Sequence, residues 1–167
     1  MKRNIAEERQ DRVKELTRFA EENKIPVKNM ILLNTALTHT SYVNEHKNQV
    51  HHDNERLEFL GDAVLDLVVG EYLFMRFPSW PEGDLPRAKA SVVCLQSCAS
   101  RFHIGEHMRL GKGEEKSGGR TRETILGDAF EAVIGAIYLD NDYQVVSRFI
   151  LGHMKKFLDI VDQGTYD

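Results

Sequence analysis

The amino-acid sequence predicts an all-α protein, a bundle of helices in one domain. Apolar residues recur with the three- and four-residue spacing of helices that bury one side, and no stretch shows the strict alternation of a half-buried strand. Pro26, Pro78 and Pro81 interrupt this pattern where helices are expected to end. With 167 residues, the chain is long enough to bury a single core.

The first half of the chain is expected to contain three helices. A charged amphipathic helix ends before Pro26, and Asn29 is a suitable cap for the next helix. A polar, irregular stretch follows, and then a long helix that Asp53 or Asn54 caps. The expected helices are Ala6–Glu22, Met30–Leu37 and Asn54 to about Arg76, with Thr38–His52 irregular.

The second half is expected to hold three long helices, with a short helix or turn and a glycine-rich loop between the first and the second. Asp84 and Pro86 are typical of a helix start, and Asp140 and Asn141 favour a turn. The expected elements are a helix from Leu85 to about Phe102, a short helix or turn at Ile104–Leu110, a loop at Gly111–Gly119, a helix from Arg120 or Thr121 to about Leu139, and a helix at Tyr143–Val161. Residues 1–162 are therefore expected to form the domain, and residues 163–167 a tail or the start of a linker.

Composition indicates a soluble globular protein, expected in the cytoplasm. The net charge of -4 does not by itself indicate nucleic-acid binding, but it is compatible with it if acids bind metal and basic residues cluster. Cys94 and Cys98 lie in an apolar stretch and are expected to be core thiols, because a zinc site needs further ligands. No apolar run is long enough to span a membrane.

Acidic residues lie at helical spacing in the long central helix. Glu55, Glu58 and Asp62 are at i, i+3 and i+7 and therefore share one face, although like charges at this spacing repel by about 0.2–0.5 kcal/mol per pair. A solvated surface face would explain them, and so would a divalent cation such as Mg²⁺, which prefers oxygen ligands.

A second acidic pair favours the metal. Asp128 is the acid of a Gly-Asp-Ala sequence like that at Gly61, and Glu131 follows it at i+3 in the same apolar helix. Two apolar helices with two inward acids each are typical of a four-carboxylate metal site. The alternative is that these acids cap helices or form salt bridges.

Several motifs resemble the ribonuclease III family. The segment at 54–65, NERLEFLGDAVL, is similar to the family's signature. Further similarity follows in the family's order over nearly the whole chain, in ALTHTSY at 36–42, EGDL at 82–85, SGGR at 117–120 and GDAFEA at 127–132.

The resemblance implies a ribonuclease III catalytic fold and a Mg²⁺-dependent endonuclease, with Mn²⁺ as a substitute, that cuts double-stranded RNA. The products implied are 5′-phosphate and 3′-hydroxyl ends with short 3′ overhangs, made in the processing of ribosomal and other RNA. Glu58, Asp128 and Glu131 match direct metal ligands. Asp62 matches an acid that binds metal directly or through water and orients the nucleophile. Asp62 and Glu131 are thus the expected catalytic residues.

The resemblance also implies a homodimer in which the signature helices meet. Phe59 matches an aromatic residue that reaches into the partner, although the pattern alone also fits a core phenylalanine. Glu55 and Glu82 match additional acids, which support the site or reach it from the partner subunit; alternatively, Glu82 is a loop acid near a helix start. Common bacterial members continue into a double-stranded-RNA-binding domain, so this chain is expected to be a catalytic domain without that module.

Contacts with RNA are expected from basic residues in one loop-rich region, because duplex RNA is recognised mainly through its shape, phosphates and 2′-hydroxyls. The alternative is solvated loop charge balanced by glutamates. The residues are Arg109, Lys112, Lys116, Arg120 and Arg122. His39 is expected to be structural, and His103 and His107 to be surface residues.

Two rival functions differ in the chemistry they require. A relative that binds structured RNA without cutting it would be expected to lack the four acids, which are intact here. A helical metal phosphohydrolase acting on nucleotides would be expected to use His–Asp pairs, and the one such step, His52-Asp53, lies outside a credible ligand set.

Overall fold

The structure is a computed structural model that describes residues 3–92 and 102–162. Within these ranges it is helical, and its one β contact is an isolated parallel bridge between Thr38 and Arg109. The elements are α1 (Ile5–Glu22), α2 (Met30–Ala36), α3 (Thr40–Glu45), α4 (Glu55–Arg76), α5 (Asp84–Val92), α7 (Ile104–His107), α8 (Lys112–Lys116), the 3₁₀ turn η1 (Gly119–Thr121), α9 (Glu123–Asp140) and α10 (Tyr143–Asp162). The all-α prediction is confirmed.

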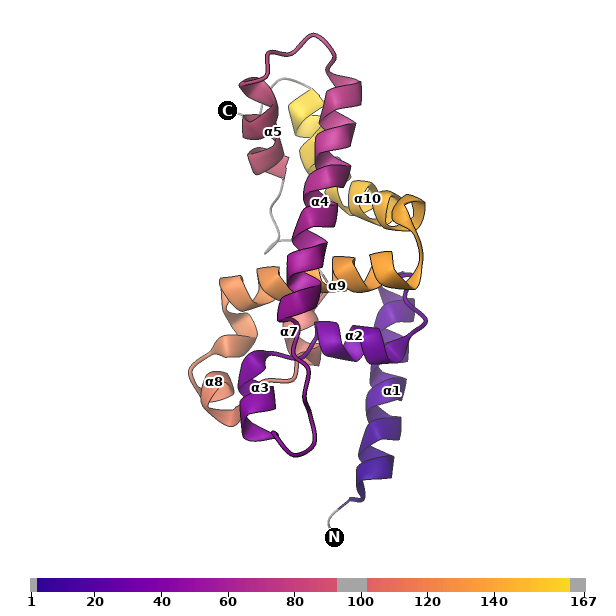
Figure 1. Cartoon of the computed structure of the whole chain (residues 1–167), viewed down its shortest axis with the longest axis vertical. Helices are drawn as coiled ribbons and strands as arrows, with labels where there is room; N and C mark the ends of the chain where they lie inside the picture. The colour runs from indigo at the N-terminus through magenta and orange to yellow at the C-terminus, as the bar shows by residue number, and fades with distance from the viewer. Residues whose placement is uncertain (1–2, 93–101, 163–167) are drawn as a thin grey trace.

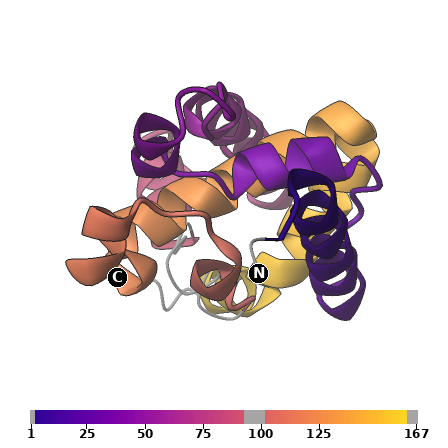
Figure 2. The ribbon, with the colours of Figure 1, turned by 90° about the horizontal axis from the view of Figure 1, so that it is seen from below.

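Helices α4 and α9 are the centre of the fold. They make the most extensive contact between any two described elements, and they cross in the middle of the molecule (Figure 1). Viewed from below, α9 runs through the interior with the other helices around it (Figure 2). Helix α9 is suited to this place because almost all of its residues from Ile125 to Ile137 are buried.

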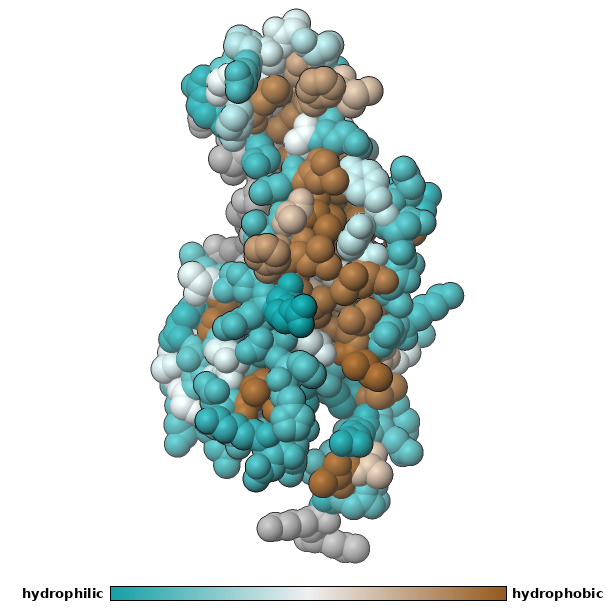
Figure 3. Space-filling model, viewed as in Figure 1, coloured by the Kyte–Doolittle hydropathy of each residue, from teal (hydrophilic) through white to brown (hydrophobic). Residues whose placement is uncertain are grey.

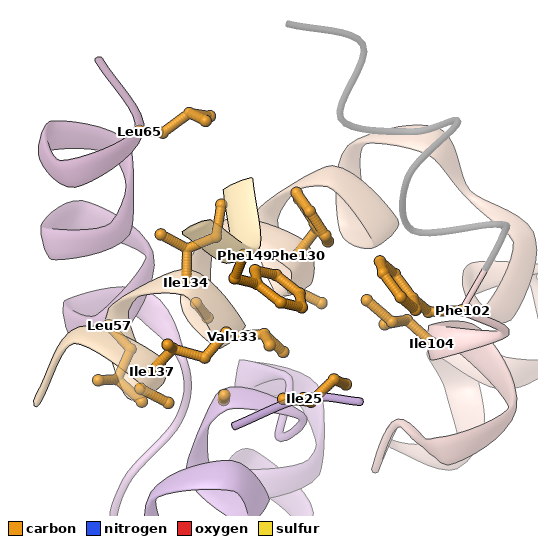
Figure 4. Packing of buried hydrophobic residues seen from close by; sticks show 14 of the residues in the cluster. Ile25, Leu57, Leu65, Phe102, Ile104, Phe130, Val133, Ile134, Ile137 and Phe149 are labelled. Carbon is orange, nitrogen blue, oxygen red and sulfur yellow. The ribbon is translucent and has the colours of Figure 1, made fainter. Parts of the chain in front are cut away.

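The core surrounds α9 with aliphatic and aromatic side chains. Phe102 lies 5.9 Å, ring centre to ring centre, from both Phe130 and Phe149, and these rings face one another in Figure 4. Ile134 and Ile137, one turn apart on α9, are fully buried. Side chains on several sides hold α9 in place, which limits how its acids can move.

Two differences from the expected helices have local causes, and a third expectation falls outside the described residues. The stretch expected to be irregular contains α3, because the His39 side chain accepts the Ser41 amide and so caps a short helix. The glycine-rich loop contains α8 and η1, which delays the start of α9 to Glu123. The helix expected to reach Phe102 is described as far as Val92, and Cys94 and Cys98 lie outside the described residues.

Two side-chain predictions were wrong. The helical pattern of the signature segment predicts that Leu57, Leu60, Val64 and Leu67 all pack against apolar neighbours, but Leu67 is 57% exposed, because it lies on the side of α4 that faces away from α9. His107 was expected on the surface, yet its ring packs 4.6 Å from that of Phe19 and its Nδ1 lies 3.1 Å from Glu15. Among the described residues, no helix is both long and apolar enough to cross a membrane.

Candidate metal and catalytic site

Two glycines let α4 and α9 approach closely. A Cβ atom added to Gly61 would lie 1.7 Å from the main-chain oxygen of Glu131, and one added to Gly135 would lie 2.4 Å from the main-chain oxygen of Leu57. Each glycine thus faces the backbone of the other helix. The residue that Gly61 meets, Glu131, lies four residues before Gly135, and the residue that Gly135 meets, Leu57, lies four residues before Gly61. A side chain at either position would push the helices apart.

This crossing brings the two predicted acid pairs together. The carboxyl groups of Glu58 on α4 and Asp128 on α9 are hydrogen-bonded to each other. Glu131 is buried, with 9% of its surface exposed, whereas Asp62 and Asp128 are exposed and Glu58 is half-buried. The sequence-predicted pairs therefore form one cluster with a buried end and an open end.

Burial and the neighbouring acids raise the pKa values of the two glutamates in the cluster. Burial, followed by the charges of Asp62, Glu58 and Asp128, raises the pKa of Glu131 to about 8. Burial and the nearby Asp128 raise the pKa of Glu58 to about 7. Without a cation, the site therefore holds protons near neutral pH.

The donor set fits a hard divalent cation. It consists of carboxylate oxygens, which Mg²⁺ and Mn²⁺ prefer, and their mutual repulsion is what a bound positive charge relieves. Among the described residues, no three acid, histidine or cysteine side chains stand close enough to hold one ion together. Glu58 and Asp128, which are hydrogen-bonded to each other, would have to turn their oxygens toward the ion.

Asp66 is an acid near the site that the sequence reasoning missed. Its charge contributes to the raised pKa of Glu131, and it forms an ion pair of 3.3 Å with Lys89. The signal was present in the sequence, because Glu58, Asp62 and Asp66 follow one another at intervals of four residues and so continue one face of α4.

The two additional acids lie at opposite ends of α4. Glu55 is exposed one turn before Glu58, and its charge helps to raise the pKa of Glu58. Glu82 is exposed in the connection between α4 and α5, which follows the end of α4 at Arg76, and this end lies about 27 Å along the helix axis from Glu58 if each helical residue rises 1.5 Å. The fold therefore brings Glu55, and not Glu82, to the site within one protomer.

The five predicted RNA-contact residues differ in their surroundings. Arg109 donates two hydrogen bonds to the Thr38 hydroxyl and lies over the Tyr42 ring. Arg120 donates to two main-chain oxygens and to Glu115, and Arg122 contacts Glu114 and Ser117. These three arginines stabilise the 105–122 region, whereas the two lysines, Lys112 and Lys116, are exposed on α8.

An apolar stripe follows the exposed side of α4 beside the acids. It consists of Phe59, Ala63, Leu67, Gly70 and Phe74, and the three large side chains are 81%, 57% and 68% exposed in chain order. Figure 3 shows apolar residues gathered over α4 and polar residues over α3 and α8. Phe59 is thus on the surface of the protomer and outside its core.

Comparison with known proteins decides the family. A family model described as ribonuclease-III-like matches residues 29–158. The chain belongs to the ribonuclease III family. It is 47% identical over 170 residues to ribonuclease 3 of Geobacillus kaustophilus, covering 99% of this chain and 66% of that protein. It is 54% identical over 129 residues to the Geobacillus thermodenitrificans enzyme, covering 75% and 52%.

Solved ribonuclease III structures share the fold. The nuclease domain of ribonuclease III from Campylobacter jejuni, described as flexible in a region involved in dimer formation, has a TM-score of 0.77 and 39% sequence identity. The match covers 85% of this chain and 97% of that domain. This chain thus corresponds to a ribonuclease III nuclease domain, and it spans 66% or less of the length of the two curated relatives above.

Proposed function

We propose that this chain is the catalytic domain of a divalent-metal-dependent endoribonuclease that hydrolyses double-stranded RNA. The observation that carries the proposal is that a glycine-lined helix crossing, in a member of the ribonuclease III family, brings two acids of α4 and two of α9 near enough for their charges to raise the pKa values of Glu58 and Glu131. The products proposed are 5′-phosphate and 3′-hydroxyl ends with short 3′ overhangs, and the cellular role is processing of ribosomal and other RNA.

Glu58, Asp62, Asp128 and Glu131 are the proposed ligands of Mg²⁺, for which Mn²⁺ would substitute. When bound, the cation supplies positive charge beside the reacting phosphate and lowers the pKa of water. Asp62, which is exposed at the open end of the cluster, orients the water that attacks the phosphorus. Glu131, held by the backbone of the crossing, keeps the buried end of the site in place.

Protons and the cation compete for this site. A carboxyl group must lose its proton to bind a metal, and the pKa values of Glu58 and Glu131 lie near 7 and 8. Metal affinity therefore increases as the pH rises through this range, and binding releases protons. Calorimetric titration of the protein with Mg²⁺ at pH 7 tests this competition. Repeating the titration in buffers of different ionisation enthalpy gives the number of protons released on binding.

The apolar stripe on α4 is the proposed dimer contact. It places large exposed apolar side chains on one helix face, and a monomer rarely exposes a contiguous apolar surface of this kind without a binding role. In a twofold dimer the stripe of one copy faces that of the other. Two active sites then lie on either side of the contact, one for each RNA strand, and Glu82 of one copy would reach the other copy's site.

Lys112 and Lys116 are the proposed phosphate contacts. Both are exposed on α8, and the Lys112 amide donates to Glu45 on α3, which connects α8 to the segment before the signature helix. Arg109, Arg120 and Arg122 are proposed to shape this surface through their internal contacts and to add positive potential to it.

Cleavage of a long, perfectly paired RNA at low salt tests the function. We expect Mg²⁺-dependent cutting to short duplexes, none in EDTA, and none by Glu131→Gln, which should remain folded and dimeric. RNA binding without cutting by the wild-type dimer would favour a non-catalytic relative. Cleavage by Glu131→Gln at the wild-type rate would remove Glu131 from the site.

A further inference from the structure

The ammonium group of Lys89 lies beside the acidic face of α4. Its Nζ is 3.3 Å from a carboxylate oxygen of Asp66. Asp66 follows Glu58 and Asp62 at intervals of four residues, so it lies about 6 Å farther along the axis of α4 than Asp62 if each helical residue rises 1.5 Å. The fold therefore places a positive charge one helical turn beyond the open end of the proposed metal site.

Helix α5 determines where the Lys89 side chain begins. This helix packs beside α4 and also contacts α10 (Figure 1). Ala88 is fully buried, and Leu85 packs against the core. Lys89 follows Ala88 directly and lies one turn after Leu85, so its backbone is fixed next to α4. Its flexible four-carbon stem still lets the ammonium group move.

The ion pair with Asp66 leaves Lys89 able to bind a second anion. An ammonium group carries three hydrogen-bond donors, and a single carboxylate oxygen at 3.3 Å does not use all of them. The side chains of Lys89 and Asp66 are 36% and 49% exposed, so water screens the pair and its contribution to stability is small. A role in binding accounts for this lysine better than a role in folding.

RNA needs positive charge at this place. The acids of α4 and α9 gather negative charge at the crossing, and every nucleotide of the RNA adds another negative charge. A cation in the proposed site compensates the phosphate that reacts. The phosphates next to it along the strand need other partners, and lysine side chains are common partners of phosphates.

We propose that Lys89 binds a phosphate of the strand that is cut, next to the phosphate at the metal, and so positions that strand on the acids. Asp66 acts behind Lys89 by holding the ammonium group against α4. Contacts of this kind fix the register of a nucleic acid without reading its sequence. This inference rests on the proposed function, because it requires that RNA reaches the metal site.

Helix α5 also supplies a matched control. Arg87 is a second basic residue of the same helix, but it points about 200° away from Lys89 around the helix axis, and its guanidinium group pairs with Asp84 at 2.6 Å. Arg87→Gln and Lys89→Gln therefore remove the same charge from opposite sides of α5. Asp66→Asn removes the acid and keeps its shape. The double variant Asp66→Asn/Lys89→Gln has the net charge of the parent chain.

Binding of a perfectly paired RNA in Mg²⁺ is measured at several salt concentrations, with each change made in the Glu131→Gln chain so that the RNA stays intact. Lys89→Gln should bind about tenfold more weakly, with a salt slope lower by about one per chain. Lys89→Arg, which keeps the charge, Asp66→Asn and Arg87→Gln should bind within about threefold of the parent. The double variant should bind as weakly as Lys89→Gln.

The double variant separates a phosphate contact from a general effect of charge. Recovery of the parent affinity in this variant would mean that Lys89 only neutralises Asp66, and it would overturn the proposal. An equal loss in Arg87→Gln, or an unchanged affinity in Lys89→Gln, would also overturn it. If neither the wild type nor the Glu131→Gln chain binds paired RNA, the proposed function fails, and the role of Lys89 fails with it.

Discussion

Replacing Glu131 by Gln should make the metal-free protein more stable at pH 8, although it should abolish activity. The reason is the raised pKa of this buried carboxyl group, about 8 compared with an ordinary value of 4.5. Gln has nearly the same shape and never carries the charge that α9 buries beside the other acids. The variant therefore removes a repulsion and leaves the packing of the helix crossing unchanged.

The sign follows from proton binding. Between pH 4.5 and 8 the folded state keeps the Glu131 proton and the unfolded state loses it, so the stability of the wild type falls as the pH rises through this range. Below pH 4.5 both states hold the proton, and above about 8 neither does. The advantage of the variant is thus absent near pH 4.5 and greatest at pH 8 and above.

The magnitude has an upper limit of about 5 kcal/mol, since each pKa unit corresponds to about 1.36 kcal/mol. Asp62 and Asp128 are exposed, so water screens their repulsion of an ionised Glu131, and we expect about 2–3 kcal/mol at pH 8. For a chain of this length, that corresponds to an increase of about 4–12 °C in melting temperature.

Thermal unfolding in EDTA, at fixed protein concentration from pH 5 to 8.5, measures the effect. Glu22→Gln, which changes an exposed glutamate at the end of α1, is the control and should not change the pH dependence. Added Mg²⁺ should stabilise the wild type, as any ligand of the folded state does, and should stabilise Glu131→Gln much less. An unchanged or lower melting temperature for Glu131→Gln at pH 8 would refute the conclusion that the ionised Glu131 carboxylate destabilises the metal-free fold.

Three further predictions concern the helix crossing and the two binding surfaces. Gly61→Ala should destabilise the fold by about 3 kcal/mol or more, because the added methyl group overpacks the helix crossing. The control Gly152→Ala, whose added methyl group meets nothing within 4 Å, should stabilise the fold by about 0.5–1 kcal/mol. Urea denaturation of both variants measures these changes. Phe59→Ser should weaken dimerisation by about 100-fold in sedimentation equilibrium, because each copy loses an exposed aromatic side chain that the proposed dimer contact would bury, and the protomer should remain folded. Reversing both charges in Lys112→Glu/Lys116→Glu should weaken RNA binding and flatten its salt dependence; an unchanged salt slope would place the phosphate contacts elsewhere.

The long helices and the acid pairs could be predicted from the sequence because their signals are local. Glu58 and Asp62 share a face at any position where their segment is helical, and the same holds for Asp128 and Glu131. That the two pairs would face each other depends on the crossing, which Gly61 and Gly135 determine through contacts 74 residues apart. The repeated Gly-Asp-Ala pattern favoured a shared four-carboxylate site, and the family resemblance matched the four acids to its ligands.

The sequence predicted less about short elements and long-range polar contacts. Helix α3 depends on a histidine cap, and His is not among the residues usually favoured there. The inward position of His107 depends on Glu15, which is 92 residues away. Arginines were grouped as RNA contacts by their place in the chain, yet Arg120 and Arg109 bind oxygens that only the folded chain brings to them.

The reciprocal placement of Gly61 and Gly135 has a consequence for protein design. The separation of the acid pairs is determined by main-chain contact, so two short stretches, residues 57–62 and 128–135, contain the geometry of the site. Grafting four acids onto another helix pair without these glycines would leave the axes at the usual 8–10 Å. A graft that includes both glycines in register should transfer the spacing between the acids along with the acids themselves.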